Sequence, residues 1–403
     1  MSDPLAYLGA QLDAWRKAGT YQRLRILESA SAAESRFDGR DVINLASNNY
    51  LGLTTHPKLV EAAIDAVRKF GAGSGAVRTI SGTMSLHMQL EERIARFKNV
   101  EACVVFQSGF AANAGTVSAI LGPEDHIISD ELNHASIIDG CRLSKAKIHV
   151  FPHKDVAAAA KILQELASAP GRKLLISDGV FSMDGDIGPL PGLVEAAERW
   201  GAIMMVDDAH ASGVLGRAGR GTVDHFGLHG RVHIQVGTLS KAIGVLGGYV
   251  CGGRDLIEFL YHRARPFLFS TSHPPAVAAA CLAAFDVLDQ EPERIQNLWG
   301  NTKYFKQGLA TAGFNTGMSE TPITPVIVGE AKAAHQLSAE LFQQGVLATG
   351  IGFPTVPEGK ARVRTIVTAT HTREQLDRAL EVFRRVGASM GILKASSITA
   401  RKS

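Results

Sequence analysis

Short apolar segments separated by longer amphipathic ones are the feature that most restricts the fold of this chain. The apolar segments in its middle are Ala102–Phe106, His126–Ser129, Leu174–Ser177, Ala202–Val206, Val232–Val236 and Gly248–Cys251. Runs of this length are typical of strands that are buried on both faces, and the helical stretches between them are long enough for parallel crossovers. The sequence therefore predicts an α/β fold with a mostly parallel central sheet flanked by helices.

The length of the chain predicts more than one domain. Its 403 residues exceed the roughly 250–300 residues at which a single hydrophobic core stops growing. We expect an N-terminal arm over residues 1–45 (a helix followed by a short polar segment), a large domain over 46–290 and a smaller C-terminal α+β domain over 291–403. Further predicted strands are 324–328, 346–348 and 362–366, and further predicted helices are 56–70, 86–97, 334–344 and 372–386. The last helix opens with Thr372 and Gln375 at the spacing of a capping box.

Composition excludes several classes of function. A net charge of +3 without a Lys/Arg block argues against nucleic acid as a partner, and it fits either an anionic small substrate or plain solubility. The four cysteines lack zinc or disulfide-scaffold spacing, so we expect no metal site. The N-terminus lacks a secretion-signal pattern, and the alanine-rich stretch 276–288 is too short to span a bilayer. We therefore expect a cytoplasmic protein without a membrane partner.

Lys241 lies in a turn of small residues directly after a predicted strand. Thr238 and Ser240 precede it and can bind phosphate oxygens through their hydroxyl groups, while Gly244 follows it. A lysine in this setting suits a Schiff base with pyridoxal phosphate (PLP). The alternative is an ordinary surface lysine at the end of a strand.

Polar side chains also follow the other predicted strands, where ligands bind in open α/β sheets. Gly109 opens a helix after one strand, which makes either an anion cradle or a simple glycine turn. Asp207 ends another strand, where a carboxylate needs a cation such as a protonated pyridine nitrogen; a metal site or a structural cap are the alternatives. Ser182 can bind a ring oxygen, although the neighbouring Asp184-Gly185 pair also suits an ordinary turn. His134 is either a residue that stacks on a cofactor or a structural histidine.

Other motifs are excluded by their context. The glycine-rich run 71–75 follows a predicted helix instead of a strand, so it is not a dinucleotide fingerprint. The sequence contains no Walker A motif and no Gly-x-Ser-x-Gly elbow.

Taken together, these segments resemble the α-oxoamine synthases, a family of PLP enzymes with the type I transferase fold. The resemblance extends over nearly the whole chain, and its most specific segments are 44–53, Asn133–Gly140, Asp178–Asp186, Val206–His210 and Gly237–Lys241. It implies that Lys241 forms the Schiff base and that Asp207 pairs with the pyridine nitrogen. The other implied roles are a stacking His134, a phenolic-oxygen site of Ser182 and His210, and a phosphate site of Gly109, Phe110 and Thr238, joined by Ser270 and Thr271 from a second subunit of a homodimer. Asn48 and Arg364 are implied as substrate-carboxylate anchors, with Thr355 as a further substrate-binding residue.

The resemblance also implies the reaction, which joins a small amino acid to an acyl-CoA and gives an α-aminoketone and free CoA. Glycine with acetyl-CoA is the favoured pair, that is, glycine C-acetyltransferase activity as used in threonine degradation, because Ser74–Thr83 and Asn133–Gly140 look closest to that branch. The alternative is alanine with a pimeloyl thioester, which gives 8-amino-7-oxononanoate for biotin synthesis, or a bifunctional enzyme that uses both. The segment 353–357 resembles that second branch. An aminotransferase or a decarboxylase on the same fold is a more distant alternative.

Overall fold

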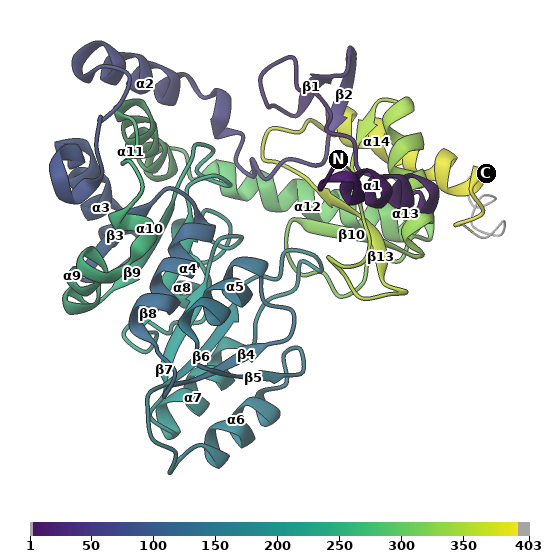
Figure 1. Ribbon diagram of the computed structural model, residues 1–403. Coiled ribbons are helices and arrows are strands. Elements are labelled where there is room, and N and C mark those ends of the chain that lie inside the picture. Colours follow the sequence, from purple (N-terminus) through teal and green to yellow (C-terminus); the bar gives the residue numbers. More distant parts are fainter. Residues whose placement is uncertain (1–2, 394–403) are drawn as a thin grey trace. The chain divides into compact units, whose positions relative to one another are not determined.

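The computed structural model describes residues 3–393, which form two compact units. Within the described residues, the large unit comprises 48–182 and 186–296, and the small unit comprises 3–47, 183–185 and 297–393. The boundary near residue 297 falls inside a helix of twenty residues, Glu293–Ala312. Each unit is described by itself (Figure 1).

A seven-stranded sheet forms the centre of the large unit. Its strands are β3 (Ala102–Phe106), β4 (His126–Asp130), β5 (Lys147–Phe151), β6 (Lys173–Asp178), β7 (Ile203–Asp207), β8 (Ile234–Thr238) and β9 (Gly248–Gly252). Their order is β3-β9-β8-β7-β6-β4-β5. Strand β9 is antiparallel to both of its neighbours, and the remaining strands run in one direction. The prediction of a mostly parallel sheet is therefore confirmed.

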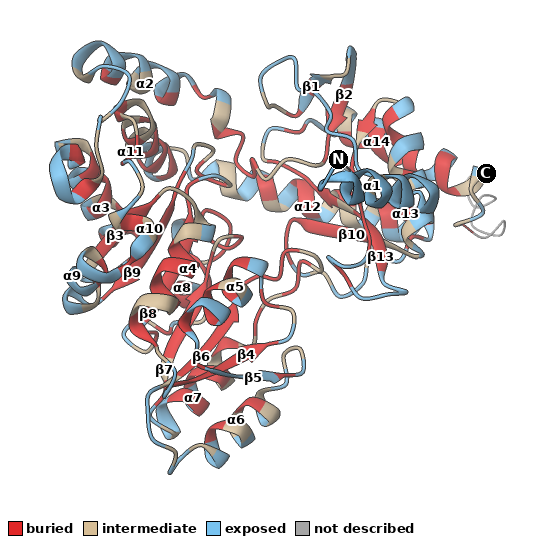
Figure 2. Ribbon diagram, in the orientation of Figure 1, coloured by how far each residue is buried: buried red, intermediate tan, exposed pale blue. Residues whose placement is uncertain are grey.

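Helices cover both faces of this sheet because successive strand residues point to opposite sides. Ile127 packs in one apolar core and its neighbour Ile128 packs in the other. The first core contains side chains of α4 (Gly109–Ile120), α5 (Ala135–Ser144), α9 (Arg254–Arg263) and α10 (Arg265–Leu268). The second contains side chains of α6 (Val156–Glu165), α7 (Leu190–Arg199) and α8 (Thr222–His225). Figure 2 shows the resulting burial of the central strands between the two helix layers.

The large unit contains six further helical segments among its described residues. They are η1 (Leu53–Thr55), α2 (Pro57–Phe70), η2 (Arg78–Gly82), α3 (Ser85–Lys98), η3 (Arg217–Gly219) and α11 (Pro275–Gln290). Helix α2 begins after His56, whose ring accepts a hydrogen bond from the Lys58 N–H, and it ends at Gly71, as the sequence predicts. Helix α11 lies beside α2 (Figure 1).

Two details of this sheet differ from the sequence expectation. Strand β5 was not predicted, because it is an exposed edge strand in which Lys147 and His149 interrupt the apolar pattern. Strand β8 begins and ends two residues later than predicted, because it continues to pair with β9 through Gly237 and Thr238. A Cβ atom at Gly237 would lie 2.2 Å from the Tyr249 ring, so this pairing requires glycine.

The small unit contains two small sheets and four helices among its described residues. The strands are β1 (Glu34–Phe37), β2 (Arg40–Asn44), β10 (Ile323–Gly329), β11 (Val346–Leu347), β12 (Thr349–Ile351) and β13 (Ala361–Ile366), in the orders β1-β2-β11 and β10-β13-β12. The helices are α1 (Ala6–Ala18), α12 (Glu293–Ala312), α13 (Ala331–Gln343) and α14 (Arg373–Ser389). Helix α14 starts with the predicted capping box, in which the Thr372 and Gln375 side chains each bind the other residue's backbone N–H.

Residues 3–47 of the N-terminal arm are part of this unit. The sequence predicts a helix followed by a short polar segment, and the residues after α1 include the antiparallel pair β1–β2. Strand β2 pairs in parallel with β11, through Ile43 opposite Val346. This pairing joins residues about three hundred positions apart, so local periodicity does not reveal it. No helix among residues 3–393 is both long and apolar enough to cross a bilayer.

Candidate active site

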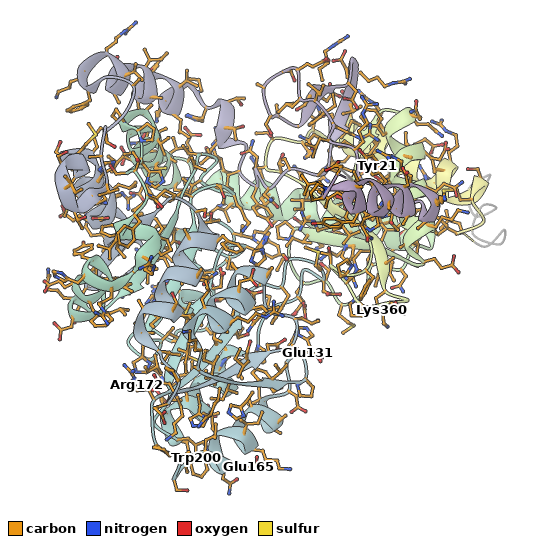
Figure 3. The ribbon with its side chains drawn as sticks, in the orientation of Figure 1. Tyr21, Glu131, Glu165, Arg172, Trp200 and Lys360 are labelled. Atoms are coloured by element: carbon orange, nitrogen blue, oxygen red, sulfur yellow. The ribbon has the colours of Figure 1, made fainter. Side chains whose placement is uncertain are left out.

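A cavity of about 170 Å³ lies at the carboxyl ends of the parallel strands of the large unit. Figure 3 labels Arg172, which precedes β6, and Glu131, which follows β4, so the two residues mark opposite ends of the parallel strands. The cavity lies at the carboxyl ends, which Glu131 marks. The lining residues are Ser108, Gly109, Phe110, His134, Ser136, Asp178, Val180, Ser182, Asp207, Ala209, His210, Thr238, Ser240 and Lys241. Parallel strands bring their carboxyl ends to one edge, which explains why segments far apart in sequence meet here.

Two aspartates end neighbouring strands in the same register. Asp178 of β6 is the direct partner of Asp207 of β7, and both side chains line the cavity. Burial raises the pKa of Asp178 well above its usual value, and the charge of Asp207 raises it further; the His134 N–H and the Lys241 amine act in the opposite direction. Of this pair, Asp178 is the carboxyl group whose neutral form is favoured by burial and by the neighbouring charge.

Two hydrogen bonds hold the Asp207 carboxylate. The Ala209 N–H donates to Oδ1 over 2.8 Å, and Asn113 Nδ2 donates to Oδ2 over 2.6 Å. Asp207 is 4% exposed, and a buried carboxylate that accepts from donors on both oxygens is stabilised in its charged form. Asp207 can therefore pair with a cationic ring nitrogen in the cavity.

Two histidines line the cavity, and each has a protein partner at Nδ1. His210 Nδ1 lies 2.8 Å from the Tyr50 hydroxyl oxygen. His134 Nδ1 lies 2.7 Å from Ser136 Oγ and also accepts from the Ser136 N–H over 3.2 Å, because His134 is the N-cap of α5. The His134 N–H donates to Asp178 Oδ2 over 3.0 Å, which fixes the start of α5 against the end of β6.

The N-terminus of α4 and the turn after β8 form the opposite end of the cavity. Ser108 caps α4 by accepting from the Ala111 N–H, and Gly109 is the first residue of the helix. A Cβ atom at Gly109 would lie 3.5 Å from the Thr238 Cβ, so the two segments face each other at short range. The hydroxyl oxygens of Thr238 and Ser240 lie 2.8 Å apart. Backbone N–H groups at a helix start and nearby hydroxyls are donors suited to a phosphate.

The residues of this cavity fit PLP. The phosphate needs donors, and the N-terminus of α4 with the hydroxyls of Thr238 and Ser240 supplies them. The aldehyde needs an amine, which Lys241 brings to the same cavity. The pyridine nitrogen needs a negative partner, which is Asp207. No group of three or more His, Cys, Asp or Glu residues in the described part of the chain is arranged to hold a metal ion.

Eight of the thirteen site residues proposed from the sequence line this cavity. They are Gly109, Phe110, His134, Ser182, Asp207, His210, Thr238 and Lys241. Ser270 and Thr271 do not line it; the Gln107 side chain donates to the Thr271 backbone oxygen over 2.8 Å, and their expected role belongs to a second subunit. Asn48 is also outside the lining, and its Oδ1 atom is buried without a hydrogen-bond partner among the described residues.

Arg364 and Thr355 belong to the small unit, where their roles stay predictions. Arg364 lies on β13, two residues after Arg362 and on the same face of the strand. Arg362 is engaged by Asp184, at 2.5 Å, and by the Met183 backbone oxygen, at 3.0 Å. Gly185 has a positive φ of 73°, as a turn glycine does. The Asp184-Gly185 pair is therefore explained as a turn that binds Arg362.

Sequence reasoning missed four polar residues of the site. Asp178, Ser136 and Ser108 line the cavity, and Asn113 holds Asp207. Asp178 could have been found because it ends a strand just as Asp207 does. Ser136 and Asn113 carry no such signal, since both lie inside helices and reach the site only through side-chain contacts.

Comparison with known proteins agrees with this geometry. Residues 40–383 match the family model described as aminotransferase class I and II. The chain is 61% identical to the 8-amino-7-oxononanoate synthase of Symbiobacterium thermophilum over 96% of this chain and 99% of the relative. It is 56% identical to the enzyme of the same name from Thermoanaerobacter pseudethanolicus, over 96% of this chain and 98% of the relative.

A solved structure gives the same result for the fold. A serine palmitoyltransferase variant from S. paucimobilis, with a bound PLP–myriocin aldimine, is 32% identical to this chain and superposes on it with a TM-score of 0.92. The match covers 97% of this chain and 100% of the solved chain. The fold is thus that of the type I PLP-dependent transferases, as predicted. On these grounds the chain belongs to the aminotransferase class I and II family and, within it, to the α-oxoamine synthase group of PLP-dependent acyltransferases.

Proposed function

We propose that this chain is an 8-amino-7-oxononanoate synthase, which joins alanine to a pimeloyl thioester. The observation that carries the choice of substrates is the identity of 61% and 56%, over 96% of the chain, to two relatives of that name. A seven-carbon acyl group and a three-carbon amino acid give a nine-carbon product, so one carbon leaves as carbon dioxide. The carbon–sulfur bond of the thioester breaks, and the thiol is released. This specificity replaces the glycine and acetyl-CoA pair favoured from the sequence, which the relatives' names do not support.

PLP is the proposed cofactor, held through Lys241. When bound, it supplies an electron-withdrawing ring that stabilises negative charge at the amino acid's α-carbon. The convergence of Lys241, Asp207 and the N-terminus of α4 on one cavity supports this assignment. Lys241 would hold the cofactor through Nζ and, when its amine is free, would take the proton from the alanine α-carbon. Asp207 would pair with the pyridine nitrogen and favour its protonated form.

The other cavity residues orient the reacting groups. Ser182 and His210 bind the phenolic oxygen, and the Tyr50 contact at His210 Nδ1 fixes that ring. His134 stacks on the cofactor and donates a hydrogen bond to the thioester oxygen as negative charge develops there. Asn48 and Arg364 are the proposed anchors of the alanine carboxylate, and Thr355 is a further proposed substrate-binding residue. Holding the reacting groups in the productive orientation would lower the activation barrier by several kcal/mol.

A homodimer completes the site in this proposal. Ser270 and Thr271 of a second subunit add hydroxyl donors to the phosphate. The Gln107 contact with the Thr271 backbone supports the idea that this segment has a fixed conformation before it meets a partner. If the site is shared between subunits, diluting the protein below the dissociation constant of the dimer should lower PLP affinity and activity together.

A thioester panel tests the choice of substrates. PLP-saturated protein is mixed with acetyl, pimeloyl or palmitoyl thioesters and with alanine, glycine or serine, and thiol release and product mass are measured. We expect kcat/KM for pimeloyl thioester with alanine to exceed every other pair by about 100-fold or more, as expected when a buried site discriminates by polar as well as apolar contacts. Equal or faster turnover of acetyl-CoA with glycine would show that the sequence-based preference was right after all.

The same protein with alanine alone distinguishes the reaction class. An aminotransferase converts its cofactor to the pyridoxamine form and releases pyruvate. A synthase does neither, and it releases thiol and product only after the thioester is added. Lys241→Ala serves as the inactive control, and Lys161→Ala, an exposed lysine on α6, serves as the matched surface control.

A further inference from the structure

A chain of hydrogen bonds joins Asp207 to His134 through two buried residues that have no assigned role. Asn113 Nδ2 lies 2.6 Å from Asp207 Oδ2 and 2.9 Å from Ser136 Oγ. Ser136 Oγ in turn lies 2.7 Å from His134 Nδ1. Asn113 and Ser136 are each 1% exposed, so water does not compete for these contacts.

We propose that Asn113 and Ser136 are positioning residues that hold His134 in the tautomer with its proton on Nε2. The inference deepens the proposed function and rests on it for the role of His134. It assigns the direction of every hydrogen bond between the carboxylate and the imidazole.

Counting donors fixes that direction. The Asp207 carboxylate only accepts, so the amide group facing it must be the Nδ2 of Asn113. The second hydrogen of the same Nδ2 points to Ser136 Oγ, which therefore accepts there and has its own hydrogen left to donate. His134 Nδ1 is the acceptor within reach of that hydroxyl.

A second donor reaches the same nitrogen. The Ser136 backbone N–H points at His134 Nδ1 over 3.2 Å. Two donors directed at Nδ1 oppose a proton on it, so the ring proton lies on Nε2, the nitrogen on the other side of the ring. The opposite tautomer would reverse the hydroxyl contact, with Nδ1–H donating to Ser136 Oγ, and would set an N–H against the backbone N–H of Ser136.

Asp207 sets the orientation of the Asn113 amide. The Asn113 Oδ1 atom is buried and has no hydrogen-bond partner among residues 3–393, so no contact of that oxygen favours the rotated amide. A rotated amide would place Oδ1 against the carboxylate, with two acceptors facing each other. The Asp207 carboxylate thus also sets the tautomer of His134 through Asn113 and Ser136.

In the proposed reaction, His134 Nε2 therefore always acts as a hydrogen-bond donor. With the proton on Nε2, His134 presents an N–H to the thioester oxygen without first gaining a proton. A wrong tautomer would present a lone pair to the developing negative charge instead. If His134 were only the N-cap of α5, the Ser136 N–H would be the only contact that it needs. The additional Asn113–Ser136 hydrogen bond therefore favours a role in fixing the tautomer over a purely structural cap.

The test combines ring nitrogen shifts with kinetics on the PLP-loaded enzyme. Protein with ¹⁵N-labelled histidine is measured by two-dimensional NMR, and His134→Asn identifies the His134 signals. The variants are Ser136→Ala, Asn113→Leu and the conservative Ser136→Thr, which retains Oγ. Ser144→Ala, at the far end of α5, and Ser118→Ala, on α4, are matched controls away from the cavity.

We expect the wild type and both controls to show the Nε2–H tautomer, and Ser136→Ala and Asn113→Leu to show a mixture. For the same two variants we expect kcat to fall about 10-fold or more, as for the loss of a hydrogen bond to a charged or developing-charge group, while KM for alanine changes less than twofold. Ser136→Thr should restore both readouts. The test does not depend on whether Asn113→Leu folds, because Ser136→Ala removes the Oγ hydroxyl that Ser136→Thr retains.

An Nδ1–H or doubly protonated His134 in the wild type overturns the proposal. So does an unchanged tautomer in Ser136→Ala together with wild-type kcat. Failure of the proposed function is recognised separately: the wild type then turns over no pimeloyl thioester with alanine, whereas the ring nitrogen shifts still report the tautomer.

Discussion

Lys98 Nζ lies 2.7 Å from Asp208 Oδ2, and both side chains are completely buried. Lys98 also donates to the Arg220 backbone oxygen, and the Asp208 carboxylate accepts from both the backbone N–H and the hydroxyl of Thr222. Asp208 follows Asp207 directly, so this ion pair fixes the turn that carries Asp207 and His210 into the cavity.

Removing the lysine leaves a buried charge without its partner. We expect Lys98→Met to lower the free energy of unfolding by about 3–5 kcal/mol. Arg96→Met is the matched control, since its side chain is 67% exposed and its ion pair with Glu92 lies on the surface; it should change stability by less than about 0.5 kcal/mol. Urea unfolding followed by fluorescence measures both. A loss in Lys98→Met no larger than in Arg96→Met would contradict this account of the pair.

His153 connects two buried carboxylates and should make stability depend on pH. Burial by itself lowers the pKa of His153, but the hydrogen bonds to Asp130 and Asp186, with their charges, outweigh it and raise the pKa to about 9. The ring nitrogens lie 3.0 Å and 2.9 Å from the two carboxylates. Because the folded value exceeds the ordinary value of about 6.5, the stabilisation is complete below pH 6.5 and is lost as the pH rises through 9.

The size of this effect follows from the shift. The difference in unfolding free energy between wild type and His153→Gln should shrink by about 3 kcal/mol between pH 6.5 and pH 9.5. His262→Gln, an exposed histidine on α9, is the control and should show no such trend. A pH-independent difference would mean that His153 is neutral in the folded protein.

Lys241→Ala tests the covalent step of the proposed function. Without the amine, the protein should lose the visible absorbance of covalently bound PLP, and turnover should fall by about 10³-fold or more because anchor and base are both removed. Borohydride reduction followed by peptide mapping checks the wild type, where the label should be on residue 241. A label on any other lysine would refute the assignment.

The two strand-end aspartates should differ in their importance. Asp207→Asn removes the charge opposite the ring nitrogen, so exchange of the alanine α-proton should slow by about 10²-fold while PLP stays bound. Asp178→Asn should have a much smaller effect, because burial and the Asp207 charge raise the pKa of Asp178 and favour its neutral form. Proton exchange in deuterated water, followed by NMR, measures both rates. Equal effects would show that the charge is shared between the two residues.

Arg364→Ala tests the predicted carboxylate anchor. Loss of a charge-assisted hydrogen bond should raise KM for alanine about 10-fold, with less than a twofold change in KM for the thioester. Arg378→Ala, whose exposed side chain pairs with Glu34 on the surface, is the control. Steady-state kinetics with each substrate varied in turn decides, and equal losses for the two substrates would argue against the anchor.

Much of the fold was predictable because its signals are local. The strands at 102–106 and 174–177 are short apolar runs, and Thr372 with Gln375 is a capping box that needs only four consecutive residues. The strands β5, β1 and β2 were missed for other reasons. Strands β5 and β1 are largely exposed, and β2 also pairs with β11, about three hundred positions further along the chain.

The residues of the candidate site also fall into two groups, those recognisable from local sequence and those found only in the folded structure. Local sequence was enough to find Asp207 and Lys241, because a small or polar residue at or just after the end of an apolar run can be recognised within ten residues. It could not show that Asp178 is in register with Asp207, or that Asn113 binds Asp207, 94 positions away, and Ser136, 23 positions away. Strand register and side-chain hydrogen bonds depend on how helices and strands pack, and packing is a property of the whole folded chain.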